Sequence, residues 1–402
     1  MFCQKTSELF NSIKLEESRE ITIGLPASYT KNINKKYPVL ILLDGDYLFD
    51  PFYGALSYGE YWDDIPETIV IGINQNKKNQ RLDDCEFDPE IGIPKGKGAE
   101  FFEFIGSELL PYIDKKYRTA QFRIIAGHDT TAGFLNFFLY KDQPVFNAYI
   151  SLSPDLATEM ENILPKRLSE INQPIFYYQS TAEGDLDNID NPVQELTDNL
   201  KAIENPNLIY KFDDFKSASH YSMVLYSIPS ALYQIFELFK PISNIEYNEK
   251  IAILQENQAE YLDKKYTQID KIYGYKTQLR LTDVKAIETS ILKNKNYGEL
   301  EKLAVISNKY YPKDMLGEYF LAEMFEKYGE FAKAGKHYQI AYTMNEIGLY
   351  TKDAMMIKVD EMKAKLPKKS GRKEVNLVTE TPLEQTNSDV KIETPKEEIK
   401  PK

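Results

Sequence analysis

The chain has 402 residues, 42% of them hydrophobic and 13% aromatic, so it is long enough for two domains with substantial cores. Its formal net charge of -13 argues against nucleic acid and anionic membrane surfaces as general partners. No apolar run is long enough to span a bilayer. Two cysteines and three histidines form no cluster with metal-ligand spacing, so we expect neither a metal nor a cofactor.

The first residues are similar to the end of a secretion signal. Met1-Phe2-Cys3 places an apolar residue and a cysteine before a polar Gln-Lys-Thr, without the basic and apolar regions of a whole signal peptide. We therefore expect a protein exported to the periplasm or cell exterior, with its signal missing or truncated; a cytoplasmic protein is the alternative. Residues 1–18 are interpreted as an N-terminal extension.

Strand-like and helical patterns alternate between residues 19 and 243. Apolar runs typical of strands occur at 19–25, 39–43, 68–73, 122–125, 148–152, 175–178 and 208–212. Helical spacing of apolar residues occurs at 99–117, 134–139, 192–203 and 228–239. This alternation predicts an α/β domain with a mostly parallel sheet and helices on both faces.

From about residue 245 the patterns are helical only. Residues 315–346 place small, turn and aromatic residues as one tetratricopeptide repeat does: Ala322, Gly329, Ala334, Tyr338 and Ala341. The neighbouring stretches, about 281–314 and 349–366, fit poorly, and a helical hairpin without a ligand gives the same pattern. We expect an all-α, tetratricopeptide-like domain at 244–366 that contacts a protein partner. The Lys/Glu/Thr/Pro-rich residues 367–402 are expected to be a disordered tail.

A strand, a tight glycine turn and a helix meet in residues 121–134, QFRIIAGHDTTAGF. This is the context of the G-x-S-x-G nucleophile elbow of α/β-hydrolases. Asp129 stands where the serine should be, and Thr131 stands where the second glycine should be. We expect the branched Thr131 to perturb the elbow, so that Asp129→Ser alone would not restore a serine esterase.

Further segments share a common pattern. Residues 37–46 contain YPVL and LDGD, residues 81–84 read RLDD, residues 108–119 contain ELLPYID and YRT, and residues 148–154 read AYISLSP. These segments resemble the putative-esterase family of α/β-hydrolases, which includes esterase D and the ferri-siderophore esterases. The resemblance covers roughly residues 20–240. It implies an α/β-hydrolase fold and a small ester-like ligand.

The resemblance also implies which residues form the catalytic pair. His220 lies where the general base of the family lies, in the loop after the last expected strand. The acid that orients it should follow the strand at 175–178. We prefer Glu183, with Asp185 as the alternative and Asp187 as a weaker one. His128, beside the nucleophile position, is expected to pack rather than to catalyse.

The family would stabilise an oxyanion with backbone N–H groups of Thr130 and of the Asp46–Tyr47 loop. Attack of the Asp129 carboxylate on an ester would give an anhydride, which is uphill, whereas a carboxylate can attack alkyl halides and epoxides. Its charge would also favour an ion pair with His220.

Three hypotheses follow from these residues. The first is a catalytically impaired binding or scaffold module coupled to the helical domain. The second is an active hydrolase with Asp129 as the nucleophile, and the third is an esterase that uses water activated by His220.

Overall fold

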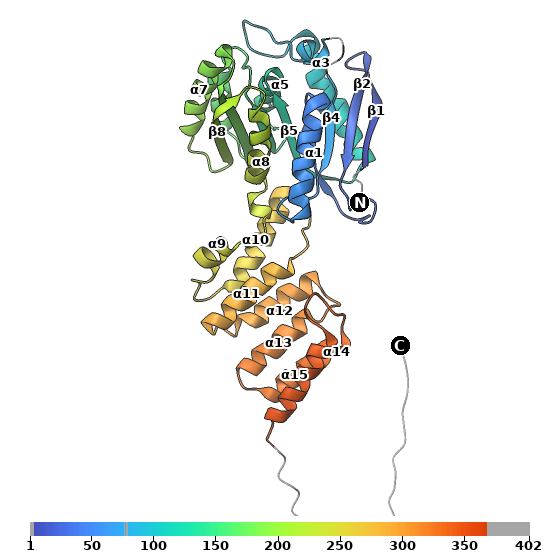
Figure 1. Ribbon diagram of the computed structural model, residues 1–402, viewed down its shortest axis with the longest axis vertical. Helices are drawn as coiled ribbons and strands as arrows, with labels where there is room; N and C mark the ends of the chain where they lie inside the picture. The colour runs from blue at the N-terminus through green and yellow to red at the C-terminus, as the bar shows by residue number, and fades with distance from the viewer. Residues whose placement is uncertain (1–3, 76, 78, 368–402) are drawn as a thin grey trace, which may run out of the picture.

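The computed structural model describes residues 4–75, 77 and 79–367 (Figure 1). An α/β body carries the N-terminus, and a column of helices extends from one end of it. Residues 1–3 of the expected signal remnant lie outside the described residues. So does the expected tail, apart from Pro367.

One eight-stranded sheet forms the α/β body, in the order β1-β2-β4-β3-β5-β6-β7-β8. Its strands are β1 (Gln4–Ser12), β2 (Glu17–Leu25), β3 (Tyr37–Leu42), β4 (Ile69–Ile73), β5 (Thr119–His128), β6 (Ala148–Leu152), β7 (Ile175–Gly184) and β8 (Leu208–Ser219). The β1–β2 and β2–β4 pairs are antiparallel, and the other pairs are parallel. The expected α/β-hydrolase architecture is confirmed.

Strand β1 was not predicted, because its residues were interpreted as an extension. The sequence QKTSELFNS has no regular apolar alternation, and Leu9 is 69% exposed. As an edge strand, β1 is held by its antiparallel pairing with β2 and by the Phe10 ring, which packs against Phe104 and Tyr112. Backbone pairing with β2 and the packing of one ring, Phe10, therefore hold this strand in place.

Helices cover both faces of the sheet (Figure 1). One face packs against α1 (Gly45–Tyr61) and α8 (Met223–Ile235). The other packs against α3 (Gly96–Glu103), α4 (Leu110–Lys116), α6 (Met160–Ser169) and α7 (Asp187–Lys201). Alternate residues of β3 pack in the hydrophobic cores on the two faces of the sheet. Leu40 and Leu42 lie on the face covered by α1, and Val39 and Ile41 lie on the opposite face.

The helix predicted over 99–117 is divided into three parts. A π-helical turn, η1 (Phe104–Leu109), separates α3 from α4. Pro111 follows as the second residue of α4. Proline lacks an N–H, and its ring clashes with the carbonyl four residues earlier, so the backbone widens here.

The C-terminal part is all-helical, as expected. It contains α9 (Asn244–Glu246), η4 (Tyr247–Ile251), α10 (Gln258–Tyr273), α11 (Leu281–Asn294), α12 (Glu299–Tyr310), α13 (Leu316–Lys327), α14 (Phe331–Thr343) and α15 (Lys352–Lys365). Ala322, Ala334 and Ala341 are fully buried in the α13–α14 hairpin, where small residues let the helices approach closely. The tetratricopeptide assignment stays a prediction. Among the described residues, none of the helices has the length and apolarity to cross a membrane.

Helix α10 joins the two parts of the molecule. Its N-terminal half packs in the helical core through Leu262 and Tyr266. Its C-terminal half packs under the sheet through Ile269 and Tyr273. The domain boundary at residue 244 stays a prediction, but part of the sheet's core comes from beyond it.

Candidate active site

The turn after β5 has the strained geometry of a nucleophile elbow. Asp129 has φ 60° and ψ −124°, a conformation that L-residues rarely adopt. Its N–H donates to the Leu152 carbonyl at 2.9 Å, and α5 (Thr130–Phe134) begins at the next residue. A Cβ on Gly127 would lie 2.8 Å from the backbone of Thr131, so a glycine is needed there. The chain thus holds Asp129 at the tip of the elbow.

Thr131 is accommodated in this elbow, contrary to the expectation that its branched side chain would perturb it. The side chain is fully buried, and its hydroxyl donates to Asp44 Oδ2 at 2.7 Å. The Thr131 hydroxyl oxygen also accepts the backbone N–H of His128 at 3.0 Å. The close approach of strand and helix is provided by Gly127 instead, so the elbow does not require a glycine at 131.

Arg81 binds the elbow from the short helix α2 (Gln80–Asp83). Its Nη1 lies 3.2 Å from Asp129 Oδ2, its Nε lies 2.7 Å from Asp44 Oδ1, and its Nη2 donates to the His128 carbonyl at 2.8 Å. Burial alone would lower the pKa of the guanidinium, but the charge and hydrogen bond of Asp44 raise it overall. The guanidinium therefore stays charged and forms ion pairs with both carboxylates, although its single positive charge can balance only one of them.

A buried polar network fixes Asp44 behind the elbow. Its N–H donates to Gln75 Oε1 at 2.9 Å, and Gln75 Nε2 donates to Asp84 Oδ2 at 2.8 Å. Asp84 also accepts two hydrogen bonds from Arg19, which is 2% exposed. The RLDD segment thus uses Arg81 to bind the elbow and Asp84 to anchor the network.

His220 and Asp185 form a buried pair at the ends of β8 and β7. His220 Nδ1 lies 2.6 Å from Asp185 Oδ1, and the Ser153 hydroxyl also donates to this carboxylate. Burial would raise the pKa of Asp185, but hydrogen bonds from His220, Ser153 and the Leu186 N–H lower it to about 2. The carboxylate therefore holds the imidazole with Nδ1 protonated, the orientation that a general base requires.

The remaining candidate residues lie as follows. Glu183, the preferred acid, is exposed and accepts the Ser217 N–H at 3.1 Å, whereas Asp185 contacts His220. The Tyr47 N–H donates to the Asp44 carbonyl at 3.1 Å. Asp46 Oδ2 accepts the Gln75 N–H at 2.6 Å. Thr130, as the first residue of α5, has an N–H without a partner inside that helix.

The ion pair expected between Asp129 and His220 does not form. Among the described residues, Asp129 pairs with Arg81, and His220 pairs with Asp185. The Asp129 carboxylate thus has a guanidinium as its partner, and the Asp185 carboxylate has an imidazole. The described residues contain no group of three or more His, Cys, Asp or Glu that could hold a metal ion.

His128 is packed between Tyr47 and His220. Its Nε2 lies 3.1 Å from the His220 carbonyl oxygen, which can only accept, so Nε2 carries the proton. Its Nδ1 lies 3.0 Å from the Tyr47 hydroxyl, and its ring centroid lies 4.5 Å from that of His220. Both ring nitrogens are occupied, so His128 positions neighbouring groups rather than acting as a base.

We expect His128 to make the folded state less stable in mild acid. Burial, followed by the charge of His220, lowers its pKa from 6.5 to about 4. Between these values the unfolded chain binds a proton that the folded chain does not. Stability should therefore fall by on the order of 3 kcal/mol as the pH falls from about 6.5 to about 4. Urea denaturation at several pH values measures this slope. His128→Gln should flatten it, and an unchanged slope would contradict the assignment.

Residues 12–182 match the family model described as Putative esterase. The chain belongs to this family. Over its length this esterase-family protein is similar to an uncharacterised protein from Capnocytophaga ochracea, with 30% identity and a TM-score of 0.82, covering 90% of this chain and 100% of that one. It also shares its fold with an IroE-like serine hydrolase from Shewanella oneidensis, with 19% identity and a TM-score of 0.56, covering 76% and 100% of the two chains. No curated protein matches the chain.

Three residues of the esterase-family site were given no role from the sequence: Arg81, described above, Ser153 and Asp44. Ser153 follows β6 and binds both Asp185 and His220, with φ 46°. Asp44, at the end of the β3 segment, receives Arg81 and Thr131. Ser153 and Asp44 follow β6 and β3, the two parallel strands that flank β5, and this position was the signal, since the ends of parallel strands meet at one edge of a sheet.

Proposed function

We propose that this protein is an esterase-family hydrolase that has lost serine-esterase chemistry and serves as a binding or scaffold module. The observation that carries the proposal is the ion pair between Asp129, at the nucleophile position, and Arg81 at 3.2 Å. Arg81 is fixed in turn by Asp44 and by the His128 carbonyl. The group at the tip of the elbow is thus a carboxylate held in an ion pair.

This pairing removes nucleophilicity in two ways. A carboxylate gives an anhydride when it attacks an ester, which is uphill, and a bound guanidinium withdraws electron density from it. The same guanidinium can also donate a hydrogen bond to the carbonyl oxygen of a small ester-like ligand. The site can therefore still bind such a ligand, although it has lost the nucleophile that would hydrolyse it.

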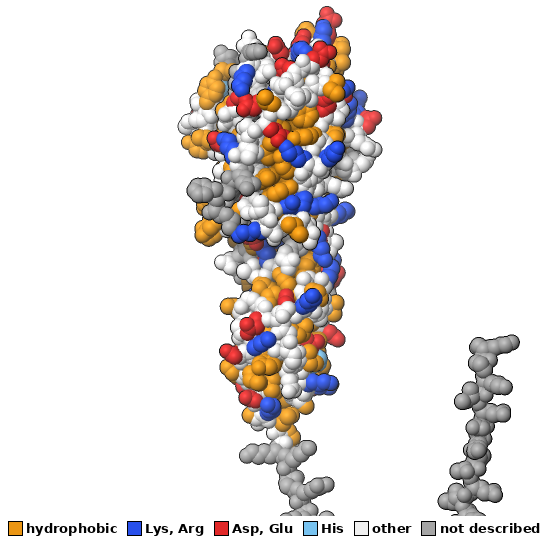
Figure 2. All heavy atoms as spheres, turned by 90° about the vertical axis from the view of Figure 1, so that its right-hand side faces the viewer, with side chains coloured by type: hydrophobic (Ala, Val, Ile, Leu, Met, Phe, Trp, Pro, Cys, Tyr) orange, Lys and Arg blue, Asp and Glu red, His pale blue; other side chains and the backbone are white. Residues whose placement is uncertain are grey.

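The helical domain supports a role in contacting a protein partner. Large hydrophobic side chains are exposed on it, among them Leu349 (90%), Val305 (67%) and Ile357 (62%). Figure 2 shows hydrophobic side chains gathered on the lower, helical part of the face in view.

The first test is ester hydrolysis. We expect the wild-type chain to hydrolyse short p-nitrophenyl esters no faster than His220→Ala, and we expect no labelling by a fluorophosphonate probe. The reason is the absence of a hydroxyl nucleophile at the elbow. Initial rates and mass spectrometry of the intact protein provide the two measurements.

One observation favours an active hydrolase as the second candidate. The His220–Asp185 pair is intact at 2.6 Å, with Asp185 held by Ser153 and Thr181 as well. A base of this kind can activate water, or can hydrolyse an ester intermediate formed on Asp129 from an epoxide or halide.

Two variants separate these candidates. Turnover that is lost in His220→Ala and kept in Asp129→Asn would show water activation. Turnover that is lost in both, with covalent labelling of Asp129 by an epoxide, would show an aspartate nucleophile. Either result would contradict the binding-module proposal.

A further inference from the structure

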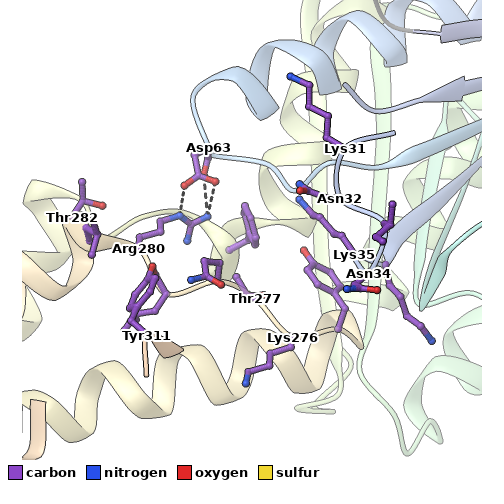
Figure 3. A pocket seen from close by; sticks show the side chains of 17 residues that line it. Lys31, Asn32, Asn34, Lys35, Asp63, Lys276, Thr277, Arg280, Thr282 and Tyr311 are labelled. Atoms are coloured by element: carbon purple, nitrogen blue, oxygen red, sulfur yellow. Dashed lines mark hydrogen bonds and ion pairs between the residues drawn. The ribbon is translucent and has the colours of Figure 1, made fainter. Parts of the chain in front are cut away.

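A large cavity lies where the α/β body meets the helical domain, away from the elbow. Its volume is about 1110 Å³, near the upper limit of small-molecule sites, which are about 300–1,000 Å³. The loop before β3 and the residue Asp63 after α1 form one side, and the α10–α11 linker forms the other. Figure 3 shows Lys31 and Lys35 on the α/β side of the cavity, and Thr277, Arg280 and Tyr311 on the side of the helical domain. Domain interfaces are preferred places for ligand sites.

The charge of this cavity is opposite to that of the whole chain. Five lining side chains are cationic and one is acidic: Lys31, Lys35, Lys36, Lys276 and Arg280, with Asp63. The chain as a whole has a net charge of -13. Figure 2 shows Lys and Arg side chains gathered near the waist between the two parts. A concave surface of one sign focuses its field and concentrates ligands of the opposite sign.

The protein itself neutralises only part of this charge. Lys35 pairs with Glu67 at 2.5 Å, and Arg280 pairs with Asp63. Lys31, Lys36 and Lys276 form no ion pair with any residue that the structure describes. The Lys276 ammonium lies over the Tyr310 ring, 5.4 Å from its centroid, so the positive charges of all three lysines remain without a carboxylate partner among the described residues.

The linker wall adds a fixed guanidinium and apolar surface. The Arg280 guanidinium lies 4.3 Å above the Phe239 ring, which fixes its plane. Leu279 and Leu281 also line the cavity. This mixture suits a ligand with both an apolar part and charged groups.

We propose that this interdomain cavity binds a small organic anion that carries at least two negative charges on phosphate or carboxylate groups. Lys31 and Lys36 contact its charged groups from the α/β body, and Lys276 and Arg280 contact them from the linker. Such a ligand bridges the two domains and is independent of the chemistry at Asp129. The site therefore gives this esterase-family chain a second ligand, remote from the elbow.

The test uses the full chain with pyrophosphate and citrate as probes of the two anion classes. Trp62, the only tryptophan, is adjacent to Asp63 at the edge of the cavity, so its fluorescence provides a local signal alongside calorimetry. We expect at least one probe to bind saturably and to change this fluorescence. Affinity should fall with added salt. Pyrophosphate alone would indicate the phosphate class, and citrate alone the carboxylate class.

Two double variants with the same change of charge distinguish the site from general electrostatics. Lys31→Gln with Lys276→Gln should weaken binding about 10-fold or more. These variants remove two positive charges that contact the anion, and Coulomb attraction is strongest at contact distance. Lys115→Gln with Lys336→Gln, exposed and outside the cavity, should leave it within about 2-fold. Equal losses in both variants, or no binding of either probe to the wild-type chain, would overturn the proposal.

Discussion

We expect Asp129→Ser alone to be labelled by a fluorophosphonate on the order of 10³-fold faster than the background reaction of the probe with the wild-type chain. The backbone at this position already has φ 60° and ψ −124°, and Gly127 allows strand and helix to approach. His220 is oriented by Asp185 at 2.6 Å. The variant therefore adds a hydroxyl to a site that keeps its elbow and its base.

The electrostatic balance of the site also allows this change. Arg81 loses one carboxylate partner but keeps Asp44 at 2.7 Å and the His128 carbonyl at 2.8 Å. One guanidinium then faces one carboxylate, so no buried charge is left unpaired. The serine hydroxyl is smaller than the carboxylate that it replaces, so it introduces no overlap.

Two controls make this prediction specific. Asp129→Ser with His220→Ala should lose the labelling, since the hydroxyl then has no base. Asp129→Ser with Thr131→Gly should label no faster than the single variant, because Asp44 would lose its 2.7 Å hydrogen bond. Labelling only when Thr131 is also replaced would show that the branched side chain blocks the site. Labelling of neither variant would show that the oxyanion donors are lost as well.

The layered fold could be predicted because buried parallel strands appear as short apolar runs. Residues 39–43 and 148–152 are examples, since both faces of these strands are covered, and Ser151 is the one small polar residue in the second run. Strand β1 could not be predicted in this way, because its stability comes from pairing with β2. The break at Pro111 was signalled by the proline itself, but its form as a π-helical turn depends on packing.

The site was predicted less completely, since its contacts join segments distant in the chain. The elbow was found because its turn requires glycine and a sharp strand-to-helix change. Glu183 and Asp185 are two positions apart and would share one face of a regular strand, so the alternation of a strand cannot choose between them. The register of β7 is irregular between Ala182 and Gly184, and Asp185 lies beyond the strand's end, where the turn sets its direction. The Arg81–Asp129 pair spans 48 positions, and no local pattern specifies it.

Tyr273→Ala should destabilise the α/β body by about 3–5 kcal/mol. The Tyr273 ring is fully buried, and its centroid lies 5.0 Å from that of Phe122 on β5 and 5.5 Å from that of Phe236. Its hydroxyl donates to the Ile235 carbonyl at 2.9 Å, at the end of α8. Removing the side chain opens a cavity under the sheet, in the region where α10 connects the two domains.

Urea denaturation measures this loss, with Tyr273→Phe and Tyr58→Ala as controls. Tyr273→Phe keeps the ring and leaves the Ile235 carbonyl without a partner, so it should cost about 1–3 kcal/mol. Tyr58 is 64% exposed on α1, so Tyr58→Ala should stay within about 0.5 kcal/mol of the wild-type chain. If Tyr273→Ala costs as little as Tyr58→Ala, α10 is not part of the sheet's core, and a fragment ending at residue 243 should fold alone. A large loss means that the α/β body needs residues beyond that boundary, because α10 supplies one wall of its core.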